Sequence, residues 1–522
     1  MKVRRFNWRM TPLFLLVILG ITLVGVVLAQ RETSYEQLKL FSEVLHMVET
    51  RYAEDVNSKE LIQAAIDGML GSLDPHSQLM EPEEHSELMI GTKGRFGGLG
   101  IQIGIRDEVL TVISPLEGTP AYRLGIQPGD RIIEIEGEST SGISLREAVN
   151  HLRGSPGTQV TITIERRGLS EPFSLTITRE IIEVDAIPYY GKVTPDIGYV
   201  RLANFSEKSG EEVANAIQDL KNRGAKKFIF DLRNNHGGLL KEALEVSEVF
   251  VKKGTLVVST RGRILGSTKE YRTEKEGVSV EDPLVVLVNQ GSASASEIVS
   301  GAIQDWDRGV ILGDTTYGKG TVQSVERLSD QNHYLKLTTA YWYLPGGRSI
   351  DAELLKKEQR KDQERLGEQR VEAGVSIYST VGELHREVPS GGGVVPDLEV
   401  NIPEPTEFEK KIYPHRDLLY RYAVEFTASH KGITKEFKEM EELVEGFKNN
   451  LRKEGIEFKE EEFEEAKDHV KIILKNQVAE ILWGTTGNYE VSLQDDIQVQ
   501  ESIQLLNKAN NRKDLFRIVA IN

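Results

Sequence analysis

The segment Gly291–Glu297, which reads Gly-Ser-Ala-Ser-Ala-Ser-Glu, places three hydroxyl groups at the start of a predicted helix, directly after the strand-like run Leu284–Asn289. Small residues let the backbone turn sharply and leave a hydroxyl exposed beside the free amides of a helix N-terminus, which stabilise negative charge. This pattern is typical of a catalytic nucleophile. An ordinary N-cap by Ser294 or Ser296, with Glu297 nearby, is the commoner explanation of such serines taken alone.

A lysine between two glycines follows downstream, in the segment Gly313–Thr321. The segment nearly matches a phosphate-binding loop, but such a loop needs a hydroxyl directly after the lysine and then a helix. Here Gly320 follows Lys319, and the next residues predict a strand, so nucleotide binding is disfavoured. Burial would lower the pKa of such a lysine enough to make it a base. Gln323 is expected on the same face of the strand as Lys319.

A histidine in the segment Asp231–Gly238, which reads Asp-Leu-Arg-Asn-Asn-His-Gly-Gly, offers an alternative base. His236 would allow a serine–histidine pair. The segment supplies no evident carboxylate to orient its ring, so we interpret His236 as a solvent contact.

The amino terminus predicts export from the cytoplasm. Four basic residues precede the largely apolar segment Leu13–Ala29, whose length is near the lower limit for spanning a bilayer. Residues 1–30 are therefore a signal anchor or a signal peptide, and the length favours an uncleaved anchor over cleavage after Ala29. Everything after Arg31 is expected outside the cytoplasm, in the periplasm or cell envelope, attached to the membrane by this segment.

The rest of the chain predicts an α/β multidomain protein. Apolar residues recur at helical spacing near the start, short alternating strands follow, and buried strands then alternate with helices. A Glu/Lys-rich helical pattern ends the chain. The expected regions are N-terminal helices at 31–92, a small β-module at 93–180, an α/β core at 181–404 with a charged insertion at 351–385, and a C-terminal helical appendage at 405–522.

Composition excludes several classes of function. The 522 residues include 64 Lys and Arg against 81 Asp and Glu, a net charge of −17, which disfavours nucleic acid as a partner. The absence of cysteine excludes disulfides, thiolate zinc sites and cysteine nucleophiles.

Six short motifs, in order and spacing, make the chain resemble the carboxyl-terminal processing peptidases, which are serine proteases with a serine–lysine dyad and an embedded PDZ domain. The resemblance covers about Tyr35 to Val400 and implies a crotonase-like α/β protease core with an inserted PDZ module. The motifs are Leu73–Ser77, Phe96–Ile101, Asp231–Gly238, Gly291–Glu297, Gly318–Gly320 and Thr338–Ala340.

The resemblance implies roles for particular residues. Ser294 matches the nucleophile, Lys319 its general base, and Gln323 the group that orients the lysine. The oxyanion donors would be the amide of Ala295 and that of Gly237 or Gly238. The family usually has proline where this chain has His236, which leaves the choice between the two glycines open.

Further residues are assigned by the same resemblance. Leu99, Gly100 and Ile101 match the PDZ loop that grips a peptide carboxylate while the peptide adds as a strand; a plain hairpin turn is the alternative. Arg153 matches a basic contact between the PDZ and protease domains. Asp74 and His76 look like a zinc or acid–base pair only in isolation, since Pro75 and the family's matching turn imply that they shape the turn.

The sequence thus predicts an extracytoplasmic serine endopeptidase that recognises the free C-terminus of protein or peptide substrates, with no metal or organic cofactor implied. A membrane-tethered PDZ adaptor with an inactive protease domain is the alternative, and the intact Ser294, Lys319 and Gln323 argue against it. The apolar stripes of residues 405–522 are a candidate homo-oligomer interface. We expect deletion after Pro405 to lower the oligomer mass or substrate uptake and to leave the dyad chemistry possible.

Overall fold

The computed structural model describes residues 35–351 without 107, 117, 167 and 168, residues 354–355, and residues 376–520 without 391 and 439. The predicted anchor Leu13–Ala29 and most of the predicted charged insertion lie outside these ranges. Among the described residues, no helix combines the length and the apolar character needed to cross a membrane. The chain divides into a small unit, which includes residues 35–81 and Gln323–Thr338, and a larger unit formed by most of the rest.

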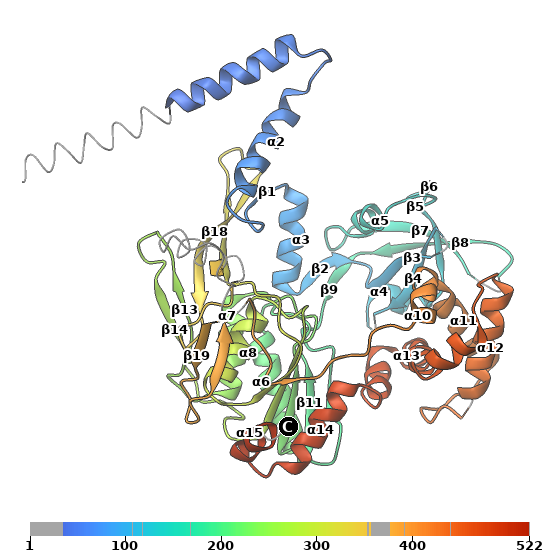
Figure 1. Cartoon of the computed structure of the whole chain (residues 1–522). Coiled ribbons are helices and arrows are strands. Elements are labelled where there is room, and N and C mark those ends of the chain that lie inside the picture. The colour runs from blue at the N-terminus through green and yellow to red at the C-terminus, as the bar shows by residue number, and fades with distance from the viewer. Residues whose placement is uncertain are drawn as a thin grey trace, which may run out of the picture. The chain divides into compact units, whose positions relative to one another are not determined.

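The larger unit contains a six-stranded sheet, most of whose strands are green in Figure 1. Its strands are parallel except for the antiparallel edge strand β10. The central strands are buried on both faces, which explains their continuous apolar sequence. In sheet order they are β10 (Tyr189–Lys192), β11 (Ile197–Arg201), β12 (Lys227–Asp231), β15 (Leu284–Val288), β16 (Val310–Gly313) and β21 (Leu398–Glu399).

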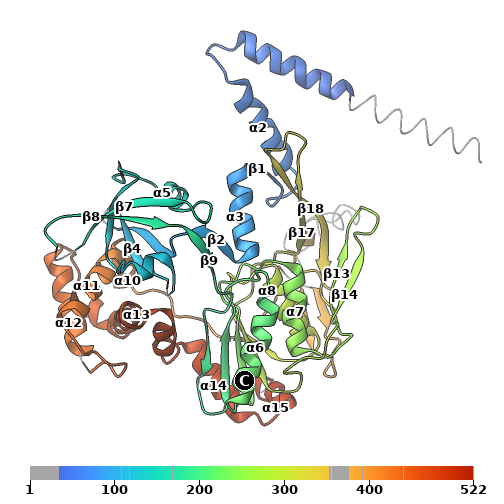
Figure 2. The same ribbon diagram turned by 180° about the vertical axis from the view of Figure 1, so that it is seen from behind.

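Helices cover both faces of this sheet (Figure 2). One face packs against α6 (Ser209–Asn222), α7 (Leu240–Phe250) and α8 (Ala295–Asp305). The other packs against α14 (Ile497–Lys508) and α15 (Arg512–Val519). The core is a three-layer α/β structure, which confirms the predicted fold class.

The C-terminal region divides by its packing. Helices α10 (Glu407–Ile412), α11 (Arg416–Ser429), α12 (Met440–Lys453) and α13 (Glu460–Ser492), with the short η1 (Tyr413–His415), share one apolar cluster. Because α14 and α15 instead complete the core, deletion after Pro405 would expose a face of the sheet. The expectation that dyad chemistry survives this deletion therefore does not hold, whereas the oligomer interface stays a prediction.

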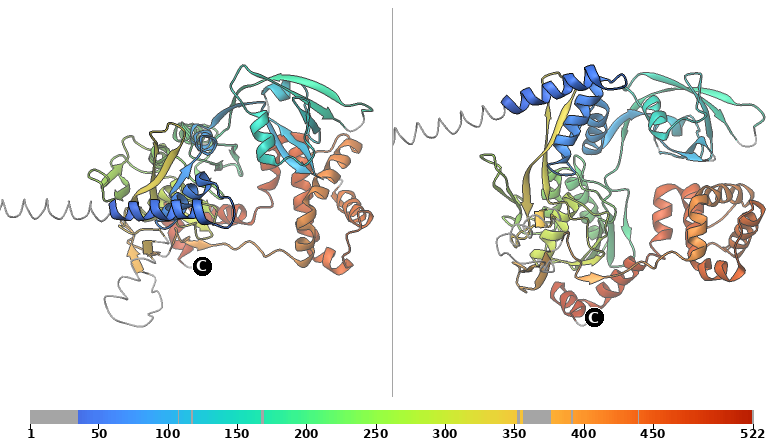
Figure 3. Two further views of the ribbon diagram at one scale, coloured as in Figure 1. Left: turned by 90° about the horizontal axis from the view of Figure 1, so that it is seen from above. Right: turned by 45° about the horizontal axis from the view of Figure 1, so that its top comes forward.

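The β-module is the cyan segment of Figure 3 and has its own apolar core. Its sheet runs β3-β4-β5-β7-β8, with β6 beside β5. The strands are β3 (Ile101–Arg106), β4 (Val109–Pro115), β5 (Arg131–Ile135), β6 (Glu138–Ser139), β7 (Gln159–Glu165) and β8 (Phe173–Thr178), with helices α4 (Pro120–Arg123) and α5 (Leu145–Leu152). Strands β2 (Arg95–Gly98) and β9 (Glu180–Glu183) pair where the chain enters and leaves the module.

The remaining elements lie outside the six-stranded sheet of the core and outside the β-module. In the small unit, residues 35–51 are helical, α2 (Ser58–Gly71) follows, and β1 (Gln78–Met80) pairs with β18 (Tyr334–Tyr343). Asp74 accepts hydrogen bonds from the amides of His76 and Ser77, so these residues shape a turn. The other elements are α3 (Pro82–Lys93), β13 (Leu256–Arg261), β14 (Lys269–Arg272), β17 (Thr321–Arg327), β19 (Ser376–Ser379) and β20 (Glu387–Ser390).

Candidate active site

Two loops leave the carboxyl ends of the adjacent parallel strands β12 and β15, and the sheet therefore brings them to the same edge. Hydrogen bonds join the loops. The Asn234 amide donates to Asn289 Oδ1 at 2.8 Å, and Asn289 Nδ2 donates to Asn234 Oδ1 at 2.9 Å. The Ala293 amide donates to the Asn235 carbonyl at 3.0 Å. The loop after β12, which contains Gly237 and Gly238, is thus bonded directly to the loop after β15, which contains the three serines. The two loops are far apart in sequence.

Burial separates the three serines of the second loop. Ser292 Oγ donates to the Leu232 carbonyl at 2.8 Å, and Ser296 Oγ donates to the Asn235 carbonyl at 2.7 Å. Both residues are fully buried, whereas Ser294 is half-buried. Two of the hydroxyls therefore hold the loops together, and Ser294 is the one serine of the three that is partly exposed.

Ser294 has an unusual backbone conformation. It occupies the N-cap position of α8 with φ 55° and ψ −110°. An ordinary N-cap residue is extended, and a non-glycine residue at positive φ costs of order 1–3 kcal/mol. A strained strand-to-helix turn of this kind is the way hydrolases present a nucleophilic serine. The conformation thus argues against a simple cap.

A buried carboxylate ties this turn to the loop that carries Lys319. Glu297 is fully buried on the first turn of α8. Its Oε2 accepts hydrogen bonds from the amides of Ser294 at 2.7 Å and Lys319 at 3.0 Å. Its Oε1 accepts from Thr316 Oγ1 at 2.6 Å and the Gly318 amide at 2.7 Å. One side chain thereby fixes the backbones of two residues that are far apart in sequence.

The protonation state of Glu297 follows from its partners. Burial raises the pKa of Glu297, and the hydrogen bonds from Thr316, Gly318, Lys319 and Ser294 oppose this rise. All four partners donate, and only an ionised carboxylate is acceptor-only. The ionised form of Glu297 therefore matches its four hydrogen-bond donors. The sequence did not reveal that Glu297 links the Ser294 turn to the loop that carries Lys319. The feature that pointed to it was its position three residues after Ser294.

For the peptidase that the sequence motifs predict, replacing Glu297 by glutamine is expected to lower kcat by about 10²-fold, because the amide NH₂ would face donors and the two loops would shift. Steady-state cleavage of a peptide, with circular dichroism to verify folding, measures the effect. Glu242→Gln is the matched control, since Glu242 is also buried and accepts the Gly210 amide at 3.0 Å on another helix. It should lower the urea midpoint and spare kcat. Equal loss of kcat in both variants would contradict the positioning role.

The two glycines of the first loop lie directly against the Ser294 turn. Gly237 has φ +96°, and a Cβ there would lie 2.9 Å from both Ser294 Cβ and the Ala295 nitrogen. Gly238 has φ +151°, and a Cβ there would overlap the Phe205 carbonyl. Only glycine satisfies both the backbone angle and the close approach. The Gly237 amide donates to Asn235 Oδ1 at 2.9 Å.

Lys319 lies between two tightly packed glycines. Gly318 has φ +88°, with no room for a Cβ against Gly392, and the Gly320 amide donates to Asp351 Oδ2 at 3.0 Å. Lys319 itself is half-buried. The residues that follow form strand β17 instead of a helix, so the phosphate-loop alternative is wrong. Gln323 lies in β17 and belongs to the small unit, and its orienting role stays a prediction.

His236, the alternative base, has an exposed side chain. This agrees with its interpretation as a solvent contact. Among the described residues, no group of three or more His, Asp or Glu side chains could hold a metal ion, Asp74 and His76 included.

The loop before β3 has a backbone that requires glycine at position 100. Gly100 has φ +76°, and a Cβ there would overlap the Thr119 side chain. β3 is the edge strand of its sheet, which leaves one side of it for an added strand. The carboxylate-binding role of Leu99, Gly100 and Ile101 stays a prediction.

Arg153, the C-cap of α5, lies over the Phe96 ring with its guanidinium 4.7 Å from the ring centroid. This contact lies between α5 and β2. The predicted contact of Arg153 with the protease core stays a prediction.

Comparison with known proteins assigns families to three regions. Residues 196–358 match peptidase family S41, residues 111–166 match the PDZ domain, and residues 26–84 match the N-terminal domain of the activating protease CtpB.

Individual relatives extend the match over most of the chain. A carboxy-terminal-processing protease of Bartonella bacilliformis is 40% identical over 352 residues, which are 67% of this chain and 80% of the relative. The carboxy-terminal processing protease CtpA of Bacillus subtilis is 35% identical over 62% of this chain and 69% of its own. Among solved structures, a photosystem II D1 C-terminal processing protease is 26% identical, with a TM-score of 0.37, over 69% of this chain and 92% of that one.

Proposed function

Since the chain belongs to the carboxy-terminal-processing proteases, a family of serine-type peptidases, we propose that Ser294 is its nucleophile and Lys319 its general base. The observation that carries this proposal is the Glu297 carboxylate, which holds the backbones of both residues through bonds of 2.7 and 3.0 Å. The strained Ser294 turn and the structural use of the neighbouring serines support the same assignment.

The reaction proceeds in two steps. Ser294 Oγ attacks the scissile carbonyl and its proton passes to the neutral Lys319 amine. The tetrahedral intermediate then collapses, the C–N bond breaks, and the Lys319 ammonium returns the proton to the leaving amine. Water repeats the sequence on the acyl-enzyme and releases Ser294. Gln323 is proposed to orient the lysine nitrogen.

The oxyanion of the intermediate is stabilised by backbone amides. Ala295 is the first residue of α8, where amides have no partner within the helix. The second donor is the amide of Gly238, because the amide of Gly237 already donates to Asn235 Oδ1. Preorganised amides of this kind account for a large part of the rate in acyl transfer.

The PDZ module selects substrates by their chain end. The amides of Leu99, Gly100 and Ile101 bind the terminal carboxylate, and the peptide pairs with the free side of β3. The protein acts outside the cytoplasm, with the segment Leu13–Ala29 as its membrane anchor and with proteins or peptides bearing a free C-terminus as substrates.

Amidation of the substrate C-terminus is expected to lower kcat/KM by about tenfold or more, because a neutral amide cannot replace a carboxylate among amide donors. Competition experiments with matched acid and amide peptides measure this ratio. Deletion of residues 93–180 would disturb the chain on both sides, so Gly100→Ala is the preferred variant: its Cβ would overlap Thr119. This variant should cleave acid and amide peptides at similar rates. A wild-type enzyme that cleaves both peptides equally would refute the C-terminal recognition.

A further inference from the structure

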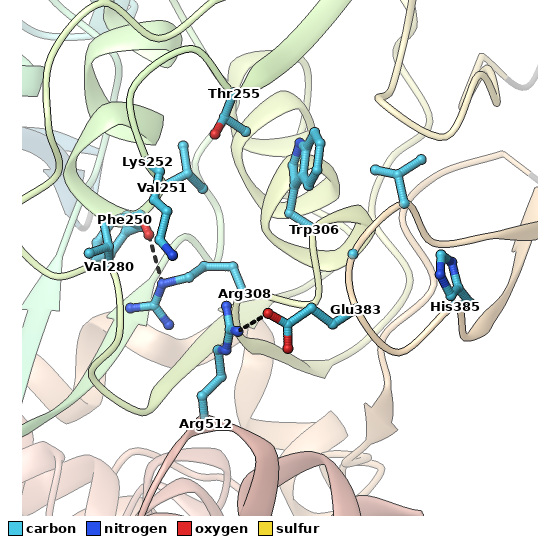
Figure 4. A pocket seen from close by; sticks show the side chains of 12 residues that line it. Phe250, Val251, Lys252, Thr255, Val280, Trp306, Arg308, Glu383, His385 and Arg512 are labelled. Atoms are coloured by element: carbon cyan, nitrogen blue, oxygen red, sulfur yellow. Dashed lines mark hydrogen bonds and ion pairs between the residues drawn. The ribbon is translucent and has the colours of Figure 1, made fainter.

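A cavity of about 360 Å³ lies in the protease core at the opposite end of α8 from Ser294 (Figure 4). α8 has 11 residues and is therefore roughly 16 Å long. Trp306, the C-cap of α8, and Arg308 line the cavity. The rest of the lining comes from the end of α7 and the segment that follows it to Thr255, from Val280, from the loop after Thr380, and from Arg512 of α15. The volume is within the range of small-molecule sites.

Arg308 is buried without a carboxylate partner in direct contact among the described residues. It is 2% exposed. Its Nε donates to the Phe250 carbonyl at 2.7 Å and one Nη donates to the Ser279 carbonyl. The other, Nη1, has no hydrogen-bond partner within the described part of the chain. A buried guanidinium with an unsatisfied N–H group is costly, and structures normally pair it.

Positive charge gathers around this group. Arg512 and Lys252 also line the cavity, and among its described lining residues Glu383 is the one carboxylate. Burial, and then the charge of Arg512, lower the pKa of Arg308 to about 9. Glu383 forms ion pairs with Arg512 at 3.7 Å, within the lining, and with Lys513 at 2.9 Å, which does not line the cavity. This cationic cavity occurs in a chain with a net charge of −17.

The carbonyls that Arg308 contacts explain part of its burial. Phe250 is the last residue of α7, where a cation stabilises the helix C-terminus. Two of the donor groups are accounted for in this way. The third donor group and the open volume are not. The two further cations each form an ion pair at the surface, Arg512 with Glu383 at 3.7 Å and Lys252 with Glu281 at 3.1 Å.

We propose that this cavity binds a small organic anion, with one carboxylate or phosphate group held by Arg308, Arg512 and Lys252. The apolar body of the ligand packs against Trp306, Val280 and Val381, which line the same cavity. A planar guanidinium matches an oxyanion in geometry as well as in charge. The site is separate from Ser294, so it stands or falls independently of the proposed catalytic mechanism.

Calorimetry on the full-length chain tests the proposal with benzoate, phenyl phosphate and inorganic phosphate as probes. One aromatic anion should bind per chain, more tightly than inorganic phosphate because of its apolar body, and neutral benzyl alcohol should not bind. Benzoate and phenyl phosphate together tell which oxyanion the site prefers. The absence of saturable binding by all three anions would overturn the proposal and leave Arg308 as a structural link.

Variants locate the site. Arg308→Gln loses two structural hydrogen bonds and can fail to fold. The test therefore uses Arg512→Gln, which should weaken binding of the aromatic anion about tenfold. Lys252→Gln should weaken binding about two- to fivefold, and Glu383→Gln should strengthen it by removing a like charge. The matched control is Lys253→Gln, since Lys253 is the exposed next residue and does not line the cavity. Equal effects of Lys252→Gln and Lys253→Gln would overturn the site.

Trp306 offers a second readout. Its indole donates to the Leu256 carbonyl at 2.7 Å and it is half-buried at the cavity. Phenyl phosphate should change the tryptophan emission, and Trp306→Phe should abolish that change and keep the calorimetric affinity within about threefold. An unchanged emission response in Trp306→Phe would place the ligand elsewhere.

Discussion

Lys319→Arg is expected to reduce peptide cleavage almost as far as Ser294→Ala does, by about 10²–10⁴-fold in kcat. The proposed base works only as a neutral amine. An arginine keeps the positive charge and the approximate length but holds its proton at any accessible pH. The backbone of the loop should be unaffected, because Glu297 accepts a hydrogen bond from the backbone amide of residue 319. This amide is present whether the side chain is lysine or arginine. Initial rates with a peptide substrate over a range of pH measure the loss.

Lys253→Arg is the matched control, since Lys253 is exposed and outside both sites. It should retain the wild-type rate. In the wild type the rate should rise with pH as the lysine loses its proton. If Lys319→Arg keeps more than about a tenth of the wild-type rate, the dyad assignment is wrong, and His236 becomes the base to examine.

Gly237→Ala is expected to abolish cleavage to a similar extent. A Cβ at Gly237 would lie 2.7 Å from the Ala293 carbonyl and 2.9 Å from Ser294 Cβ, and these atoms belong to the turn that carries the nucleophile, so they cannot move aside without displacing it. A displacement of about 1 Å at the reacting atoms costs on the order of 10²-fold in rate. The amide of Gly238, the proposed oxyanion donor, would move with it. The kcat of the purified variant measures this effect.

The backbone strain of Gly237→Ala has a close control. Gly224 has nearly the same φ, +93° against +96°, but a Cβ there would meet nothing within 4 Å. Gly224→Ala therefore carries the cost of positive φ, about 1 kcal/mol, without the clash. It should lower the thermal midpoint by a few degrees and leave kcat unchanged. A fall in kcat common to both variants would mean that strain, and not contact with Ser294, explains the loss.

The sequence predicted well those features that depend on local patterns. Buried strands such as β12 and β15 read as continuous apolar runs, and Gly100 and Gly237 lie in the loops where their motifs placed them. The α/β class and the family followed from such segments.

Features that depend on long-range packing were not predictable. The pattern of α14 and α15 is that of an amphipathic helix, and nothing local distinguishes a helix on a distant sheet from one in an appendage. Glu297 looked like a capping residue because its bond to Ser294 is local, whereas its bonds to Thr316, Gly318 and Lys319 appear only when β15 and β16 bring the two loops together.

The buried Arg308, with its Nη1 unsatisfied among the described residues, could not be found from the sequence either. It follows α8 in a segment with the ordinary polarity of a helix end. Its burial depends on α7 and on the segment around Ser279, which are distant in the chain.

Trapping of the acyl-enzyme tests the central claim most directly. A serine-reactive acylating or phosphonylating probe, followed by digestion and mass spectrometry of the full-length chain, identifies the residue that is modified. The dyad predicts a single modified hydroxyl at Ser294, no modification in Ser294→Ala, and a rate of labelling at least about tenfold slower in Lys319→Arg. Modification of Ser292 or Ser296 instead, or undiminished labelling of Ser294 in Lys319→Arg, would contradict it.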